Sequence, residues 1–428
     1  MKKILILVLI SIFLFFFGLG IFSLWETDEV IYTQVAKEII QTGDWITLHF
    51  QGSPWFIHPP MFMWLTALTG AFLGFSNFIA RIWCSIFGLI GVVTVYYFGR
   101  LLHNEESGFY SALVLATSFQ YILQSRIAIF DIPLIVLMLL AVFCFFKGYK
   151  EKKQRYYSLF YIFMGLAVFM KGPIGILLPV FIIILYLFIV GDALKVWKEC
   201  HPIVGIIFAG IIGGWWYLVE YLINGQVFVD RVIGYYTVNR FAGIVESHTG
   251  SWYYYFPVIF LGFLPWSIFL FEGIYNLFKE RKSAKENIFI LLWIGIGFVF
   301  FSMAHTKLPG YIMSLYPYLA LTVGILFATK KKMNYSFIAL AFVSSLLILL
   351  IFPLTNATLL KEYTGLGFAL VPMVFTMGGG GLIATILYFA TKRPSYALYT
   401  IVLSMFIVVF IMVVYTTPII EGFKANWH

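Results

Sequence analysis

Long apolar stretches separated by short polar connections account for most of the 428 residues. A helix needs about 20 apolar residues to cross a hydrocarbon core of about 30 Å, and most of the stretches approach that length. The sequence lacks the strand-like alternation that membrane barrels show, so the pattern predicts an all-α integral membrane bundle. We expect about 13 transmembrane helices, at residues 4–24, 78–99, 108–125, 130–146, 156–170, 173–191, 203–222, 255–277, 288–304, 310–328, 335–354, 365–390 and 396–417.

Composition and charge agree with this class and indicate an orientation. The chain is 62% hydrophobic and 11% charged, whereas soluble domains are about half apolar and a quarter charged. One set of alternating connections carries 19 of the 28 Lys and Arg residues, which leaves nine on the other side. Because cytoplasmic loops are enriched in these residues, we expect a plasma-membrane protein with its N-terminus inside and its C-terminus outside. The net charge of +9 then reflects membrane topology, and membrane lipids rather than nucleic acid are the expected partners.

Two apolar features receive structural interpretations. Met1 to Gly20 resembles a signal peptide but lacks a convincing small-residue cleavage site, so we interpret it as a retained first helix. Gly378 to Gly381 lies inside an apolar span, which favours close helix packing over a phosphate-binding loop.

The two long outer connections, at residues 25–77 and 223–254, are where we expect function within a single multi-pass domain covering 1–428. Glu26, Asp28 and Glu29 follow the first apolar segment directly. The following residues, 30–40, have the spacing of an amphipathic interfacial helix. An acidic helix cap is the alternative, although three carboxylates exceed what a cap requires.

A second acid and several cations lie on the same predicted face. Asp131 precedes Pro133 closely, so a helix start is a strong alternative to a catalytic role, and the two can coexist. Cations beside helix N-termini could hold a phosphate, while each alone could be a snorkelling anchor. The candidates are Arg126, Lys171, Arg231, Arg240 and Lys307.

The histidines and aromatic residues of this face leave two questions open. His49 and His58 could bind a divalent metal with nearby acids, but their spacing favours a structural or substrate-contacting role. The aromatic run from Trp252 to Phe256 is typical of the membrane interface, and aromatic faces also suit sugar rings.

In the order of these motifs the sequence resembles the GT-C type, polyprenyl-phosphate-dependent glycosyltransferases, specifically the bacterial family of protein O-mannosyltransferases and lipid A aminoarabinose transferases. The resemblance is carried by Glu26-Thr27-Asp28-Glu29-Val30-Ile31-Tyr32, Gly43-Asp44-Trp45, Pro59-Pro60, the Asp131 turn, Lys171-Gly172, Leu264-Pro265-Trp266 and Thr306-Lys307-Leu308-Pro309-Gly310-Tyr311. The large soluble outer domain of some members is not expected.

The resemblance implies roles for individual residues. Asp28 is the expected catalytic base with Glu29 beside it, and Asp131 is the second outer acid. His58 occupies the place of a phosphate-binding Lys, and Ile57 that of a possible metal-binding acid, so no cofactor is firmly implied. The expected donor-phosphate contacts are His58, Arg126, Lys171, Arg240 and Lys307, and the expected substrate-lining residues are Tyr32, Tyr311 and Trp252.

The implied function is inverting transfer of a hexose or pentose from a polyprenyl-phosphate donor at the outer face of the plasma membrane. The acceptor is a protein hydroxyl, lipid A or another glycan. A transporter or flippase of lipid-linked sugars is the alternative, but transporters tend to place charge at the membrane midplane beside internal repeats. In this sequence the charge lies at the outer boundary, and no internal repeat is visible.

Overall fold

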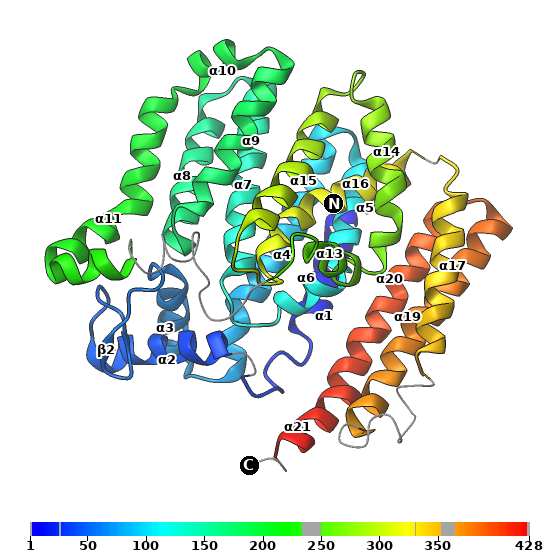
Figure 1. Cartoon of the computed structure of the whole chain (residues 1–428), viewed down its shortest axis with the longest axis horizontal. Coiled ribbons are helices and arrows are strands. Elements are labelled where there is room, and N and C mark those ends of the chain that lie inside the picture. Colours follow the sequence, from blue (N-terminus) through cyan, green and yellow to red (C-terminus); the bar gives the residue numbers. More distant parts are fainter. Residues whose placement is uncertain (1, 25–26, 233–249, 330, 352–363, 426–428) are drawn as a thin grey trace.

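The computed structural model describes residues 2–24, 27–232, 250–329, 331–351 and 364–425. Almost all of its regular structure is helical, apart from one short antiparallel hairpin (Figure 1). The elements are α1 (Lys2–Phe16), α2 (Thr27–Thr42), β1 (His49–Phe50), β2 (Ser53–Pro54), α3 (Met61–Leu73), α4 (Asn77–Leu102), α5 (Glu105–Ala116), α6 (Phe119–Gln124), α7 (Asp131–Glu151), α8 (Gln154–Lys171), α9 (Ile174–Val190), α10 (Ala193–Cys200), α11 (Pro202–Val229), α13 (Tyr255–Gly262), η2 (Trp266–Phe269), α14 (Leu270–Glu280), α15 (Lys285–Met303), η3 (Tyr311–Leu315), α16 (Tyr316–Ala328), α17 (Asn334–Leu349), α19 (Thr364–Thr391), α20 (Pro394–Ile411), η4 (Met412–Thr416) and α21 (Thr417–Ala425).

The all-α membrane prediction is confirmed, whereas the number of spans is not. Each predicted apolar segment coincides with helix over most of its described length. By length and composition, however, seven described helices can cross a membrane, or eight when one bent pair counts as a span. The pair is α13 with η2 and α14, which bends by 112° around Pro265. Proline breaks the hydrogen-bond ladder of a helix, so the single segment predicted at residues 255–277 is divided into helices of different direction.

The predicted helix after the acidic cluster is present as α2, which runs across the direction of α7 and α8 (Figure 1). It ends before Gly43, whose φ of 73° lies in the left-handed region that favours glycine. The hairpin β1–β2 and helix α3 follow it; interfacial helices were expected in the outer connection 25–77, but no range was predicted for α3. With 13 residues α3 is shorter than a typical span, and it packs against α2 and α4.

Close contacts between helices hold the bundle together. Helix α5 packs against α4 and α16, and α7 packs against α4 and α8. Helices α17, α19 and α20 form a lobe beside them (Figure 1). In that lobe a Cβ added at Gly378 or Gly381 would collide with Ser344 of α17, so the predicted packing role of these glycines is confirmed.

Candidate active site

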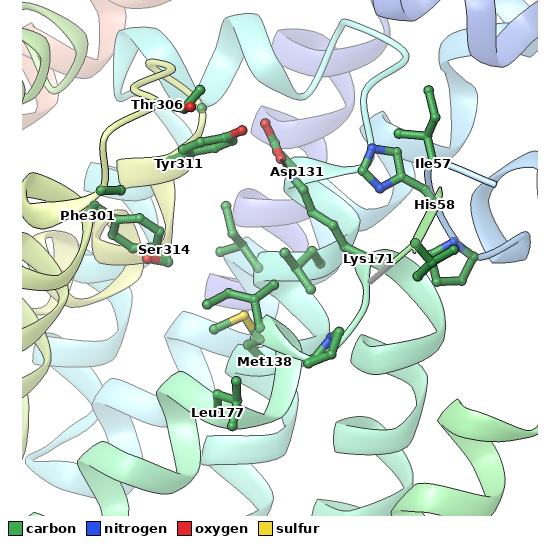
Figure 2. Close-up of a pocket in the computed structure, with 18 of the residues that line it drawn as sticks. Ile57, His58, Asp131, Met138, Lys171, Leu177, Phe301, Thr306, Tyr311 and Ser314 are labelled. Carbon is green, nitrogen blue, oxygen red and sulfur yellow. Dashed lines mark hydrogen bonds and ion pairs between the residues drawn. The ribbon is translucent and has the colours of Figure 1, made fainter. Parts of the chain in front are cut away.

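A cavity of about 390 Å³ opens where α7 begins, α8 ends and α15 ends. Polar groups lie on two opposite sides of it, and apolar side chains from α7, α9 and α15 line much of the rest (Figure 2). The lining residues whose side chains carry a polar group are His58, Asp131, Lys171, Trp216, Tyr217, Thr306, Tyr311 and Ser314. The apolar ones include Leu134, Ile135, Met138, Ile174, Leu177, Phe300 and Phe301.

Asp131 and Lys171 form an ion pair in this cavity, with 11% and 16% of their side chains exposed. Asp131 is the first residue of α7, and Lys171 is the last of α8. A carboxylate at a helix N-terminus and an ammonium at a C-terminus are both favoured by the helix dipole. After Lys171 the chain turns through Gly172, whose φ is 99°. The sequence therefore places opposite charges on two helix ends that meet at one point.

Aromatic rings and backbone fix the position of this pair. The Lys171 ammonium lies 4.8 Å from the centre of the Phe130 ring and 5.3 Å from that of Tyr311. A Cβ added at Gly310 would collide with the Asp131 carboxylate, so the segment before η3 packs directly against it. In Figure 2 the Tyr311 hydroxyl and the Lys171 side chain both point towards Asp131. These contacts hold the ion pair in one position at the edge of the cavity.

His58 lies beside the pair in an aromatic setting. It is 8% exposed, and its ring centre lies 4.4 Å from that of Phe130 and 6.1 Å from that of Tyr32. Tyr32 is 4% exposed and packs behind His58, against Phe130 and Trp55. Tyr32 therefore supports the cavity wall, whereas His58 lines the cavity itself.

Glu29 lies in a second, fully buried ion pair. Its oxygens accept two hydrogen bonds from Arg81, at 2.5 and 2.8 Å, and one from the Ala128 N–H, at 2.9 Å. The remaining Arg81 donors go to the carbonyls of Leu19, Phe22 and Ser23. Because Ala128 lies in the loop before Asp131, Glu29 ties α2 to that loop. Glu29 therefore holds the loop in position and does not line the cavity.

Two other candidate cations are committed to carbonyl oxygens. The Arg126 guanidinium donates to the carbonyls of Leu14 and Phe17, at 3.0 and 2.8 Å, and thus closes the end of α1. Lys307 is 5% exposed and donates to the carbonyls of Ser302 and Ala304, at 2.7 Å each, at the end of α15. Burial lowers the pKa of Lys307. Neither residue lines the cavity, although Thr306 beside Lys307 does.

The structure brings together four of the predicted site residues in the cavity, namely Asp131, His58, Lys171 and Tyr311. Asp28 is exposed in the first turn of α2 and does not line it. Trp252 is 68% exposed and also lies outside the lining. Arg240 falls outside the described residues.

Sequence reasoning missed three residues that the structure makes prominent. Arg81 was counted only as an outer cation, yet it lies in the second turn of the apolar helix α4, where a charge is costly without a partner. Thr306 and Ser314 line the cavity, and their buried hydroxyl oxygens lack a hydrogen-bond partner within the described part of the chain. Thr306 belongs to the motif Thr306–Tyr311 that carries the resemblance, although no role was assigned to it, whereas no sequence signal separates Ser314 from other serines.

The geometry does not favour a metal centre in the part of the chain described. Within the described ranges, no group of three or more His, Cys, Asp or Glu side chains gathers where a metal ion could bind. The site is instead built from one ion pair, one histidine, aromatic rings and hydroxyls.

Fold and site together define a multi-span helical membrane protein with a charged, mostly apolar cavity at one end of its helices. The family model described as dolichyl-phosphate-mannose-protein mannosyltransferase matches residues 57–216, which include three of the cavity-lining predictions. A crystal structure of ArnT from Cupriavidus metallidurans bound to undecaprenyl phosphate superposes with a TM-score of 0.84 at 22% identity, covering 96% of this chain and 77% of that one. The chain therefore has the fold of the ArnT structure, and residues 57–216 resemble the mannosyltransferase family model.

Two relatives are similar in sequence to most of this chain. An uncharacterized protein of Aquifex aeolicus is 26% identical over 87% of this chain and 73% of its own length. An undecaprenyl phosphate-alpha-4-amino-4-deoxy-L-arabinose arabinosyl transferase of Proteus mirabilis is 25% identical over 74% of this chain. The match spans only 58% of the Proteus protein.

Proposed function

We propose that this protein transfers a sugar from a polyprenyl-phosphate donor to an acceptor hydroxyl at the extracytoplasmic face of the plasma membrane. The observation that carries the proposal is the cavity, where the Lys171–Asp131 pair stands beside a largely apolar interior. A polyprenyl phosphate has the matching chemistry, an anionic head joined to an apolar chain. The name of the Proteus relative, which specifies undecaprenyl phosphate, supports the same donor class.

The donor phosphate is proposed to bind Lys171, with His58 beside it. Lysine binds phosphate as a point charge, and its attraction is strengthened in a site of low dielectric. Asp131 holds the ammonium in place before the donor arrives. The apolar wall from α7 and α9 then suits the isoprenoid chain, since Leu134, Ile135 and Leu177 offer it no polar competition.

The proposed reaction is an inverting displacement. The acceptor oxygen attacks the anomeric carbon, and the bond from that carbon to the phosphate oxygen breaks with its electron pair going to the phosphate. Asp28 is the proposed base for the attacking hydroxyl; because it lies outside the cavity lining, the acceptor has to bind between the start of α2 and the cavity. Lys171 stabilises the charge that develops on the leaving polyprenyl phosphate. Glu29 acts as a positioning residue, since its hydrogen bond to Ala128 joins the helix of Asp28 to the loop of Asp131.

Release of the carrier lipid tests this function. Purified protein in lipid nanodiscs is given undecaprenyl phosphate carrying 4-amino-4-deoxy-L-arabinose or mannose, with lipid A and a Ser/Thr-containing peptide as acceptors. A transferase produces free undecaprenyl phosphate and a glycosylated acceptor, and NMR of the new glycosidic bond reports whether configuration inverts. A flippase moves the loaded lipid across the bilayer and leaves the sugar–phosphate bond intact, which would refute the proposal.

Replacing Asp28 by Asn tests the base. Loss of a positioned general base lowers kcat by about 10²- to 10⁴-fold, while loss of the favourable interaction of Asp28 with the dipole of α2 should lower the unfolding temperature only slightly. Glu106→Gln is the matched control, because Glu106 is also an exposed acid in the first turn of a helix, α5. It removes a comparable favourable interaction with the helix dipole. Full activity in Asp28→Asn would eliminate Asp28 as the base.

A further inference from the structure

The cavity has two chemically different walls. His58, Asp131 and Lys171 lie on one side, while Thr306, Tyr311 and Ser314 lie on the other (Figure 2). Three residues on the second side carry hydroxyl groups, beside the apolar side chains of Phe300 and Phe301. The three come from one short stretch of chain, from the segment after α15 through η3. We call this stretch the hydroxyl wall.

Two side chains of the hydroxyl wall have unsatisfied hydrogen-bonding capacity. Thr306 and Ser314 are each only 4% exposed. Their hydroxyl oxygens have no hydrogen-bond partner among the residues the structure describes. Buried hydroxyls are normally paired, so unpaired ones that line a cavity point to a polar ligand.

The backbone of the hydroxyl wall is fixed from outside the cavity. The Trp293 indole N–H donates to the Ser314 carbonyl at 3.0 Å, and the Gln120 amide donates to the Pro309 carbonyl at 2.9 Å. Because η3 is a 3₁₀-helix, Tyr311 and Ser314, three residues apart, share one face with an axial separation of about 6 Å. That spacing is comparable to the width of one sugar ring and places Tyr311 beside the ion pair with Ser314 one turn deeper.

A sugar fits these hydroxyls better than an isoprenoid chain does. An isoprenoid has no group that donates or accepts a hydrogen bond, so it would leave Thr306 and Ser314 unsatisfied. Each hydroxyl can donate one bond and accept two, which suits the hydroxyl or amino groups of a sugar. Tyr311 adds an aromatic surface between them.

From this arrangement we infer that Thr306 and Ser314 form a sugar-recognition subsite, which binds polar substituents of the donor sugar while Lys171 holds its phosphate. The inference rests on the proposed function and extends it from the class of donor to the residues that select the sugar. Since sites built to hydrogen-bond a substrate group discriminate strongly against analogues lacking it, these positions set specificity.

Binding of three lipids to the full chain in nanodiscs tests the subsite: bare undecaprenyl phosphate and the same lipid carrying 4-amino-4-deoxy-L-arabinose or mannose. Thr306→Val and Ser314→Ala should each weaken binding of the preferred sugar-loaded lipid about tenfold, or about 1.4 kcal/mol, and leave bare undecaprenyl phosphate unchanged. Thr306→Ser keeps a hydroxyl and should retain most of the affinity. Ser267→Ala is the control, because that buried hydroxyl is also unsatisfied but lies outside the cavity lining.

Each outcome decides the inference. Equal losses for loaded and bare lipid would show that the wall contacts the carrier, and no loss in either variant would show that the hydroxyls do not reach the donor. Both results overturn the subsite while leaving the proposed transfer intact. If the unmodified protein binds neither bare nor loaded lipid, the proposed function fails, and the subsite fails with it.

Discussion

The molecule contains two acid–cation pairs near the start of α2 and the start of α7, and they differ in what surrounds them. Glu29 and Arg81 have 0% and 3% of their side chains exposed, and further hydrogen bonds join them to the backbone of Ala128 and Ser23. Asp131 and Lys171 are 11% and 16% exposed, and they face a cavity and two aromatic rings. The first pair is closed by the protein, and the second is open to a ligand.

This difference separates a structural role from a functional one, although both pairs consist of outer charges in an apolar chain. When both charges of a pair are buried, neither can leave its partner for a ligand without leaving the other charge buried and unpaired. A pair that lines a cavity can give its cation to an incoming anion. The location of the remaining hydrogen bonds, rather than the charge itself, distinguishes the two roles.

The largest expected effect comes from breaking the closed pair. Arg81→Met leaves the Glu29 carboxylate buried without its partner, which should lower the free energy of unfolding by about 3–5 kcal/mol. Thermal unfolding in detergent measures the loss. Lys171→Met is the comparison variant, because it removes a cation of similar length from the open pair and should lower stability far less. Equal losses would show that the two pairs do not differ in the way proposed.

A smaller effect, a gain in affinity for the donor lipid, is expected when the carboxylate of the open pair is removed. Asp131→Asn removes the carboxylate that competes for Lys171 and repels a phosphate, so it should bind bare undecaprenyl phosphate about tenfold more tightly, or about 1.4 kcal/mol. Lys171→Met should bind it more weakly. Isothermal titration in nanodiscs measures both, and turnover by Asp131→Asn should show slower release of the carrier. Weaker binding by Asp131→Asn would mean that Asp131 contacts the donor favourably.

The fold could be predicted from sequence as far as local pattern determines it. Apolar length placed the helices, and the acidic start with Gly43 as a stop placed α2 within a few residues. The prediction that Asp131 begins a helix is also confirmed. The pattern could not reveal how Pro265 bends its span by 112°, because the bend depends on tertiary packing as well as on the residue. It also did not give the bounds of α3, which lies in the connection where interfacial helices were expected but is too short to register as a span.

The site was less predictable because its geometry depends on pairing across long sequence separations. Asp131 and Lys171 were both expected at the outer face, yet the sequence does not reveal that they meet. Glu29 was expected beside the base, and its commitment to Arg81, 52 positions away, depends on how α2 docks on α4. Charge and order identify the candidates, whereas the fold decides which of them share a cavity.

The smallest expected effect concerns Glu38, the third acid on α2. Unlike the acids of the two ion pairs, Glu38 accepts hydrogen bonds from backbone amides of a surface hairpin. Its oxygens accept hydrogen bonds from the Gln51 and Gly52 N–H groups, at 2.9 and 3.1 Å, and hold the tight turn of the β1–β2 hairpin. Burial alone would raise its pKa, but hydrogen bonds from Gln34 and these two amides outweigh burial and lower the pKa below 4.5. Since the folded pKa is depressed, the stabilisation is complete well above pH 4.5 and is lost as the pH falls through the folded value.

Replacing Glu38 by Gln should remove one of the two turn bonds and most of this pH dependence. Hydrogen exchange at the Gln51 and Gly52 amides should quicken about fivefold at neutral pH, corresponding to about 1 kcal/mol. Unchanged exchange would show that the turn is stable without the carboxylate. Glu38 contacts the backbone of the hairpin and does not line the cavity, so donor binding by the variant should not change. That result would give Glu38 a structural role like that of Glu29.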